Sequence, residues 1–263
     1  MAAFWNEALD VALYFVILGV ALGPLERVFA AHEQPVFRRQ LWTDFFFYIG
    51  QSLIFSKATL LILGALHLYL HDNWNGGIQA TFAAWPMPLQ IIGVVLASDF
   101  LIYWAHRFSH ANEFLWRFHR VHHTSIHLDW AAAFREHPLD NIYTRLVVNL
   151  PALLLGFSFD VIASFVVFRG LWGNFIHSNT NTGMGALKYF LGSPRLHHWH
   201  HDVERNGSCN FANLNPLMDV LFGTFYDPGR MPERYGIAGD RVPRNYFAQL
   251  VYSFLPRRFI APE

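Results

Sequence analysis

Three short clusters of histidine are the residues best suited to chemistry in this sequence of 263 residues. One cluster has the spacing HxxxH, and two have the spacing HxxHH. Spacings of three and four residues place side chains on one face of a helix, with Cβ atoms roughly 5–6 Å apart. A further histidine stands alone between the second and third clusters. The candidate ligands are His106, His110, His119, His122, His123, His177, His197, His200 and His201.

So many imidazoles in short windows indicate bound metal. Without a metal, neutral imidazoles would leave many buried nitrogens unsatisfied, and charged ones would repel one another. The candidates exceed what one tetrahedral zinc ion uses, and they suit two ions with four or five nitrogens each. Imidazole binds iron, zinc, copper and nickel, so spacing does not select the metal, and zinc is a candidate occupant of a purified sample.

Two further side chains fall on the same helical stripe as the HxxxH pair. These are Asp99 and Tyr103, which precede His106 in an apolar segment. A carboxylate at membrane depth is costly and needs a partner or a function. Two roles stay open for Asp99: it orients a metal-bound histidine from behind, or it forms a salt bridge with Lys57 or an arginine.

The composition is that of a membrane protein. Hydrophobic residues make up 53% of the chain and charged residues only 14%, against roughly 25% charged in an average soluble domain. Mean hydropathy is positive, at +0.22. The formal net charge is zero, so we expect no nucleic-acid partner. The single cysteine, Cys209, excludes an intramolecular disulfide and a cysteine-rich metal site.

The apolar segments predict one all-α domain over residues 1–263. Segments 8–28, 45–70 and 89–105 reach or approach the roughly 20 residues that a spanning helix needs. No basic stretch precedes the first, so we interpret it as a permanent helix rather than a cleaved signal peptide. A polar break divides segment 146–168, which predicts a helical hairpin. The expected architecture is about three spanning helices plus this hairpin, capped by a helical, histidine-rich metal-binding region.

The basic residues predict which side of the membrane carries the histidines. Arginines such as Arg27, Arg38 and Arg135 follow the first and third apolar segments, whereas residues 71–85 contain no Lys or Arg. The positive-inside rule then puts the N-terminus outside and the metal site on the cytoplasmic side. We expect an integral membrane protein, with a bacterial inner membrane favoured over the endoplasmic reticulum.

The text around the histidines resembles one known family. HHTS at 122–125, DW at 129–130, REHPLD at 135–140 and SPRLHHWHH at 193–201 occur in order. The tail adds Asn210-Phe211, Asp219 and the triplet FGT at 222–224. Together these motifs, over about residues 99–226, resemble the fatty acid hydroxylase / sterol desaturase superfamily of membrane di-iron proteins.

The resemblance implies that the nine histidines hold two iron ions. It also places a second set of side chains in contact with the metals or just behind their ligands. Some members carry a further histidine where this chain has Asn174, and two other positions, Ser208 and Met218, also depart from the family pattern. The second set comprises His137, Asp99, Tyr103, Asn174 and Asp219.

The implied reaction is O2-dependent attack on an unactivated C–H bond of a lipid. Such chemistry needs an oxidant that side chains do not supply and a metal cofactor does. We favour hydroxylation because the superfamily contains more hydroxylases than desaturases, and lipid desaturation is the alternative. The sequence shows no haem-binding domain, flavin fingerprint or iron–sulfur cysteines. We therefore expect a separate electron donor, which is a reductase, a ferredoxin or a cytochrome.

Three functions of other classes compete with the oxygenase. A membrane cytochrome that carries electrons would need isolated histidines on facing helices, rather than clusters. A metal transporter or sensor would place its ligands near the midplane of the bilayer. A zinc hydrolase would need a general base, but Arg, Phe and Ser separate His106 from His110, so the HExxH glutamate is missing.

Overall fold

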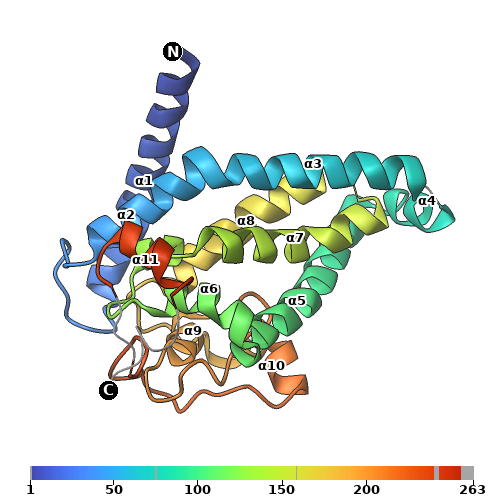
Figure 1. Ribbon diagram of the computed structural model, residues 1–263. Helices are drawn as coiled ribbons and strands as arrows, with labels where there is room; N and C mark the ends of the chain where they lie inside the picture. Colours follow the sequence, from blue (N-terminus) through green and yellow to red (C-terminus); the bar gives the residue numbers. More distant parts are fainter. Residues whose placement is uncertain (1, 75, 158, 240–242, 256–263) are drawn as a thin grey trace.

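The computed structural model describes residues 2–74, 76–157, 159–239 and 243–255, and this part of the chain is helical as predicted, with two isolated β-bridges (Figure 1). The α-helices are α1 (Ala2–Val28), α2 (Leu41–Gly50), α3 (Ser56–Asn73), α4 (Gly77–Ala83), α5 (Met87–Ala111), α6 (Glu113–His123), α7 (Pro138–Leu155), α8 (Phe159–His177), α9 (Pro194–His200), α10 (Leu217–Leu221) and α11 (Tyr246–Tyr252). Short 3₁₀ helices η2 (Trp130–Phe134) and η3 (Gly185–Tyr189), and the π-helix η1 (Gln51–Phe55), complete the set.

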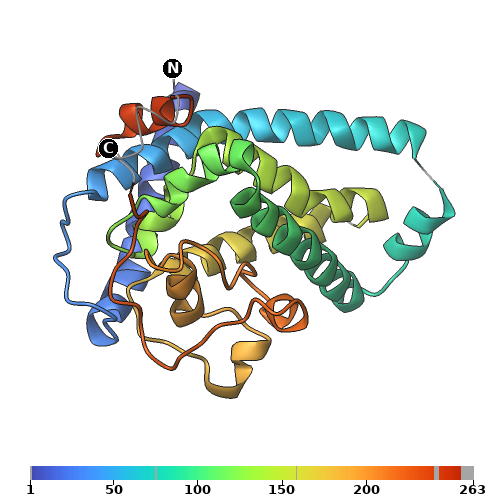
Figure 2. The same cartoon turned by 60° about the horizontal axis from the view of Figure 1, so that its bottom comes forward.

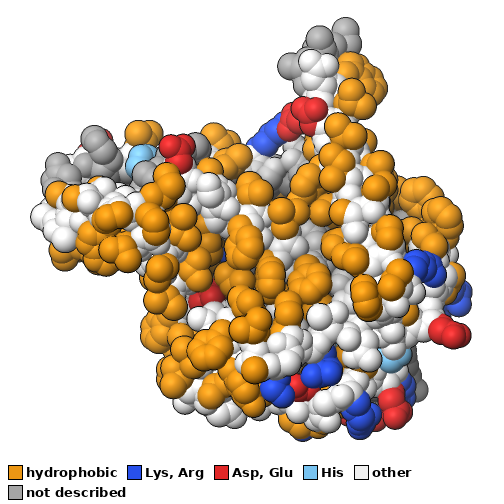
Figure 3. Space-filling model, turned by 180° about the vertical axis from the view of Figure 1, so that it is seen from behind, with side chains coloured by type: hydrophobic (Ala, Val, Ile, Leu, Met, Phe, Trp, Pro, Cys, Tyr) orange, Lys and Arg blue, Asp and Glu red, His pale blue; other side chains and the backbone are white. Residues whose placement is uncertain are grey.

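Three helical stretches are long and apolar enough to cross a membrane. They are Trp5–Val28, Leu41–Leu70 and Met87–Ala111. The second runs through α2, η1 and α3 without interruption. Seen from behind, hydrophobic side chains cover most of the surface, and charged side chains gather along the lower edge (Figure 3). The structure thus agrees with an integral membrane protein.

The predicted hairpin is formed by α7 and α8. Gly156 ends α7 in the left-handed conformation, with φ 70°, which a residue without Cβ adopts readily. A Cβ on Gly156 would also lie 2.9 Å from the Cβ of Gln79. The hairpin packs on α5 through buried apolar side chains that include Ile102, Val148 and Phe165. This packing holds α5 in place up to the turn that carries the HxxxH pair.

The turn between α5 and α6 folds the first two histidine clusters against each other. Asn112 has an extended backbone, and its Oδ1 accepts hydrogen bonds from the amides of Phe114 and Leu115. This N-cap satisfies free amides at the start of α6. The third cluster lies on α9, where Ser193 caps the helix and Pro194 occupies its first turn. Figure 2 shows α9 and the C-terminal loops lying over the ends of these helices.

A buried ion cluster ties the segment after α1 to the segment after α6. Arg38 lies 2.5 Å from Asp129 and 2.6 Å from Asp44, and Arg135 lies 2.5 Å from Asp44. Both arginine side chains are fully buried. Both arginines therefore hold the fold together, in addition to marking the loops that follow the first and third apolar segments.

Candidate metal centre

The structure brings all nine predicted histidines together, in two groups. Within each group the ligand nitrogens lie within 4.8 Å of one another. His122 and His123 are neighbours in sequence but belong to different groups, as their divergence on the helix predicts. Of the nine, only His110 is half-buried and the others are buried. The five-histidine group is His106, His110, His119, His123 and His200, and the four-histidine group is His122, His177, His197 and His201.

Hydrogen bonds behind two rings of the five-histidine group fix which of their nitrogens points inward. His106 Nδ1 lies 2.7 Å from the carbonyl of Phe211, and His119 Nδ1 lies 3.0 Å from Asp140 Oδ2. Carbonyls and carboxylates only accept, so each Nδ1 carries the proton and each Nε2 a lone pair. These two Nε2 atoms are 3.0 Å apart. Two facing lone pairs repel, and a cation that both nitrogens bind removes the repulsion.

The four-histidine group repeats this arrangement. His122 Nδ1 faces the Arg135 carbonyl at 3.2 Å, and His177 Nδ1 faces the Gly173 carbonyl at 2.7 Å. Their Nε2 atoms, each with a lone pair, lie 3.1 Å apart. In the five-histidine group, His200 Nδ1 is also held by a carbonyl, that of Cys209 at 2.8 Å, and its buried Nε2 has no hydrogen-bond partner. Both groups therefore fit a metal ion, which supplies the missing partner for these nitrogens.

Burial keeps these imidazoles in the form that binds metal. Burial lowers the pKa of His200 to about 3 and that of His177 to about 4. Burial, followed by the neighbouring histidines, lowers the pKa of His123 and His201 well below the usual value. These four rings are therefore neutral at pH 7, and a neutral imidazole is the metal ligand.

The carboxylate behind a metal-binding histidine is Asp140 rather than Asp99. Asp99 pairs with Arg169 at 2.5 Å, which is the salt-bridge role that the sequence analysis left open, and Lys57 pairs with Glu7 instead. Asp140 was missed, although it lies in the quoted stretch REHPLD, three residues after His137. It is adjacent to Pro138-Leu139 at the start of α7, from which its side chain reaches His119.

Asp219 and Tyr103 contact residues around the ligands rather than the ligand histidines themselves. Asp219 accepts hydrogen bonds from the amides of Phe211 and Ala212, at 2.8 and 2.9 Å, and from the Thr224 hydroxyl at 2.7 Å. The Tyr103 hydroxyl lies 2.9 Å from that same threonine hydroxyl. Asp219 therefore holds the residue whose carbonyl orients His106. Burial raises the pKa of Asp219 to about 6.

His137 belongs to neither group, so of its two predicted places the structure favours the one behind the ligands. Its Nδ1 accepts from the Leu139 amide and caps α7, while Nε2 lies 3.2 Å from the Leu250 carbonyl. Its physical role is to begin α7, so that Asp140 reaches His119.

Asn174 and His198 also lie outside both groups. Asn174 Nδ2 donates to the Trp130 carbonyl at 3.0 Å. His198 Nε2 faces the carbonyl of Ser178 at 3.0 Å and its Nδ1 lies 2.7 Å from the Tyr235 hydroxyl. His198 thus supports the backbone next to His177 and does not point into the four-histidine group.

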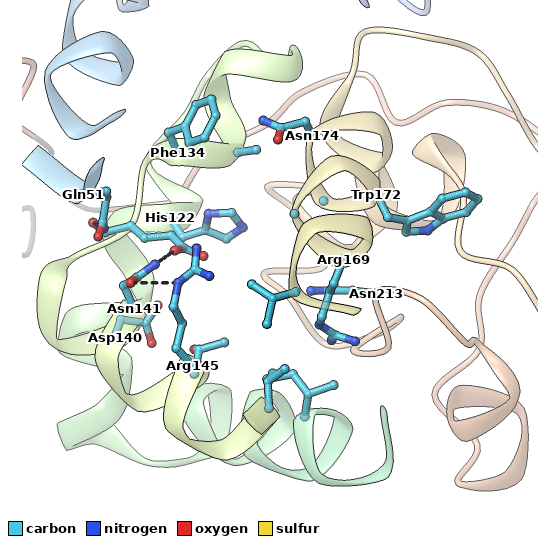
Figure 4. A pocket seen from close by; sticks show the side chains of 18 of the residues that line it. Gln51, His122, Phe134, Asp140, Asn141, Arg145, Arg169, Trp172, Asn174 and Asn213 are labelled. Carbon is cyan, nitrogen blue, oxygen red and sulfur yellow. Dashed lines mark hydrogen bonds between the residues drawn. The ribbon is translucent and has the colours of Figure 1, made fainter. Parts of the chain in front are cut away.

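A cavity of about 440 Å³ opens beside the two groups. His106 and His119 of one group and His122 and His177 of the other line it. Its remaining wall comes mainly from α7 and α8, and Figure 4 shows side chains of both helices facing the space between them. A molecule in this cavity contacts both groups at once.

Fold and site together define a helical membrane protein with two adjacent polyhistidine sites. The family profile described as Fatty acid hydroxylase matches residues 91–224, which is half of the chain and includes every histidine of both groups. The chain belongs to the fatty acid hydroxylase family. The predicted resemblance is confirmed.

Individual relatives are lipid-modifying enzymes by name. The chain is 33% identical to an ornithine lipid hydroxylase of Rhizobium tropici, over 65% of this chain and 52% of the relative. It is 33% identical to an alkylglycerol monooxygenase of Homo sapiens, over 66% and 37%. It is 26% identical to a Δ7-sterol 5(6)-desaturase of Gibberella zeae, over 65% and 45%. The chain thus spans about half or less of the length of these relatives, and no solved structure matches it.

Proposed function

We propose that the chain is an O2-dependent di-iron monooxygenase that hydroxylates an unactivated C–H bond of a lipid. One observation carries the proposal: two groups of neutral imidazoles, with their lone-pair nitrogens converging, line a single cavity. Two neighbouring redox metals beside one substrate space are suited to oxidation of that substrate. The printed activities of the ornithine lipid hydroxylase and the alkylglycerol monooxygenase support the same reaction class.

Iron bound by the two groups would supply the oxidising power that C–H cleavage needs. The protein supplies position. Backbone carbonyls and Asp140 hold the imidazoles in one orientation, so the site is preorganised before substrate enters. Apolar side chains of the cavity wall, including Phe134, Val148 and Leu214, exclude water from the carbon that reacts.

We propose that electrons come from a separate ferredoxin, reductase or cytochrome, and that the site faces the cytoplasm. The half-buried Trp116 supports an entry point, because its ring lies 4.9 Å from that of His110 and 5.5 Å from that of His123. The exposed Arg117 next to it suits an acidic carrier. The basic loops of the sequence support the cytoplasmic side, and the bacterial ornithine lipid hydroxylase supports a bacterial inner membrane.

Lipid desaturation is the second candidate, favoured by the relative that is a sterol desaturase. Both reactions begin with removal of hydrogen from the same carbon. They differ in the product, which carries either a new hydroxyl from O2 or a new double bond. The experiment below separates them.

The test compares lipids from cells that express the full chain or its variants under ¹⁸O2. We expect two iron ions per chain and a lipid that gains one ¹⁸O hydroxyl. The iron content and the amount of labelled lipid should each be lost or halved in His122→Ala and His200→Ala. His67→Gln is the control, since this exposed histidine lies outside both groups. Bound iron with neither product would contradict the oxygenase and favour an electron carrier or a transporter.

A further inference from the structure

We propose, building on the lipid oxygenase function, that the substrate carries an acidic group, a phosphate or a carboxylate, and that Arg145 and Arg169 bind it. Both arginines line the cavity that the metal-site histidines line. They lie on opposite walls, Arg145 on α7 and Arg169 on α8 (Figure 4). Ligand cavities are mostly apolar, with few polar groups that fix orientation, so paired cations in a membrane protein indicate an anionic ligand.

Arg145 is a cation without a counter-ion. Its Nε donates to Asn141 Oδ1 at 3.3 Å, and no ion pair of the described residues includes it. The nearby Glu136 accepts from Asn141 Nδ2; burial raises its pKa, and the charge of Arg145 opposes that shift. Arg145 is exposed and lines the cavity, so its charge is open to an incoming group. An acidic ligand group supplies the missing charge.

The opposite wall presents unpaired polar atoms to the same space. Arg169 Nη1 is bound to Asp99, but its buried Nη2 has no hydrogen-bond partner. Asn213 also lines the cavity, and its buried Oδ1, an acceptor, has no partner among the described residues. Buried donors without acceptors destabilise a fold. A phosphate or carboxylate, with several acceptor lone pairs, satisfies such donors.

The volume of the cavity limits which part of the lipid can enter. About 440 Å³ holds on the order of 15 groups of the size of water, at roughly 30 Å³ each. A membrane lipid with two long chains exceeds this, so the acidic head and its adjacent carbons occupy the cavity. The exposed lining residues Tyr14, Arg145 and Val167 mark the mouth, through which the chains leave beside α1. The carbon nearest the histidines is therefore close to the head group.

The experiment measures binding without turnover. The iron-loaded full chain, in dodecyl maltoside and without oxygen, is titrated calorimetrically with dodecyl phosphate, laurate and 1-dodecanol, which share one chain length. At least one acidic probe should bind about 10- to 100-fold more tightly than the alcohol, the range of charge-assisted hydrogen bonds. Arg145→Gln should remove this advantage, Arg145→Lys should keep part of it, and the exposed Arg39→Gln serves as the matched control.

The outcomes are distinct from those of the oxygenase test. Preference for dodecyl phosphate assigns a phospholipid, and preference for laurate assigns a carboxylate lipid; both support the proposal. Equal binding of all three probes overturns it. So does an unchanged preference in Arg145→Gln, which would mean that the acid binds the metals directly. For the second arginine, Arg169→Gln is combined with Asp99→Asn, so that no buried carboxylate is left unpaired, and the pair should weaken acidic probes alone.

Discussion

Replacing Asp140 by Asn tests whether this carboxylate tunes the five-histidine group. Asn keeps the size of the side chain and an acceptor oxygen for His119 Nδ1, now 3.0 Å from Asp140, but it removes the charge. The Asp140 side chain is only 5% exposed, so water does not replace the lost interaction. Carboxylates that orient a metal-binding histidine typically change metal affinity by about 10–100-fold, or about 1.4–2.7 kcal/mol. We expect a loss in that range for one of two ions.

The assay is competition for iron against a chelator of known affinity, on folded protein in detergent, with metal content read by mass spectrometry. Asp99→Asn is the matched control, because Asp99 is equally buried but pairs with Arg169 and contacts no histidine. One ion should leave Asp140→Asn at lower chelator concentration, while the control releases both ions like the wild type. The assignment would be refuted if both variants released iron like the wild type, or if both lost one ion at lower chelator concentration.

Three further perturbations test other parts of the structure. A Cβ on Gly207 would lie 2.1 Å from His110 Cε1, so Gly207→Ala should cost one metal ion by mass spectrometry; Gly223→Ala, whose φ is also positive but whose Cβ meets nothing within 4 Å, should retain both. Arg38→Met leaves a buried carboxylate unpaired, and it should lower the free energy of unfolding by about 3–5 kcal/mol in denaturant titrations. Chelation of the wild type should lower Tm by about 5–10 °C in calorimetry, and an unchanged Tm would mean that the histidines bind no stabilising metal.

The division of the nine histidines into two groups follows in part from local geometry. Helical spacing predicts that His122 and His123 diverge from each other, and the structure puts them in different groups. Spacing does not predict that His119 joins His123, because offsets of three and four both share its face. Spacing does not predict that His200 joins the first group while His201 joins the second. That outcome depends on how α9 docks against α6, which is set by long-range packing.

Roles of the supporting residues were harder to predict, because they depend on distances between elements. Asp99 lies on the helical stripe of His106, yet its carboxylate forms an ion pair with Arg169 of α8. Arg169 lies one residue beyond the predicted hairpin, and the sequence does not show which arginine reaches Asp99. Asp140 comes from the start of α7 and meets His119 only in the folded chain. Sequence periodicity describes one helix at a time, and these contacts join two.

The nature of the acceptors behind the imidazoles links the metal site to the proposed substrate. In His106, His122, His177 and His200 the outer nitrogen donates to a backbone carbonyl, and among the described residues only Asp140 puts a carboxylate on a ligand. Carbonyls are neutral, so they orient the rings without offsetting the charge of bound cations. A loaded centre of this kind makes the adjoining cavity strongly positive. Such a field would attract the acidic group proposed for the substrate, and Arg145 together with the unpartnered Nη2 of Arg169 would hold that group at one end of the cavity.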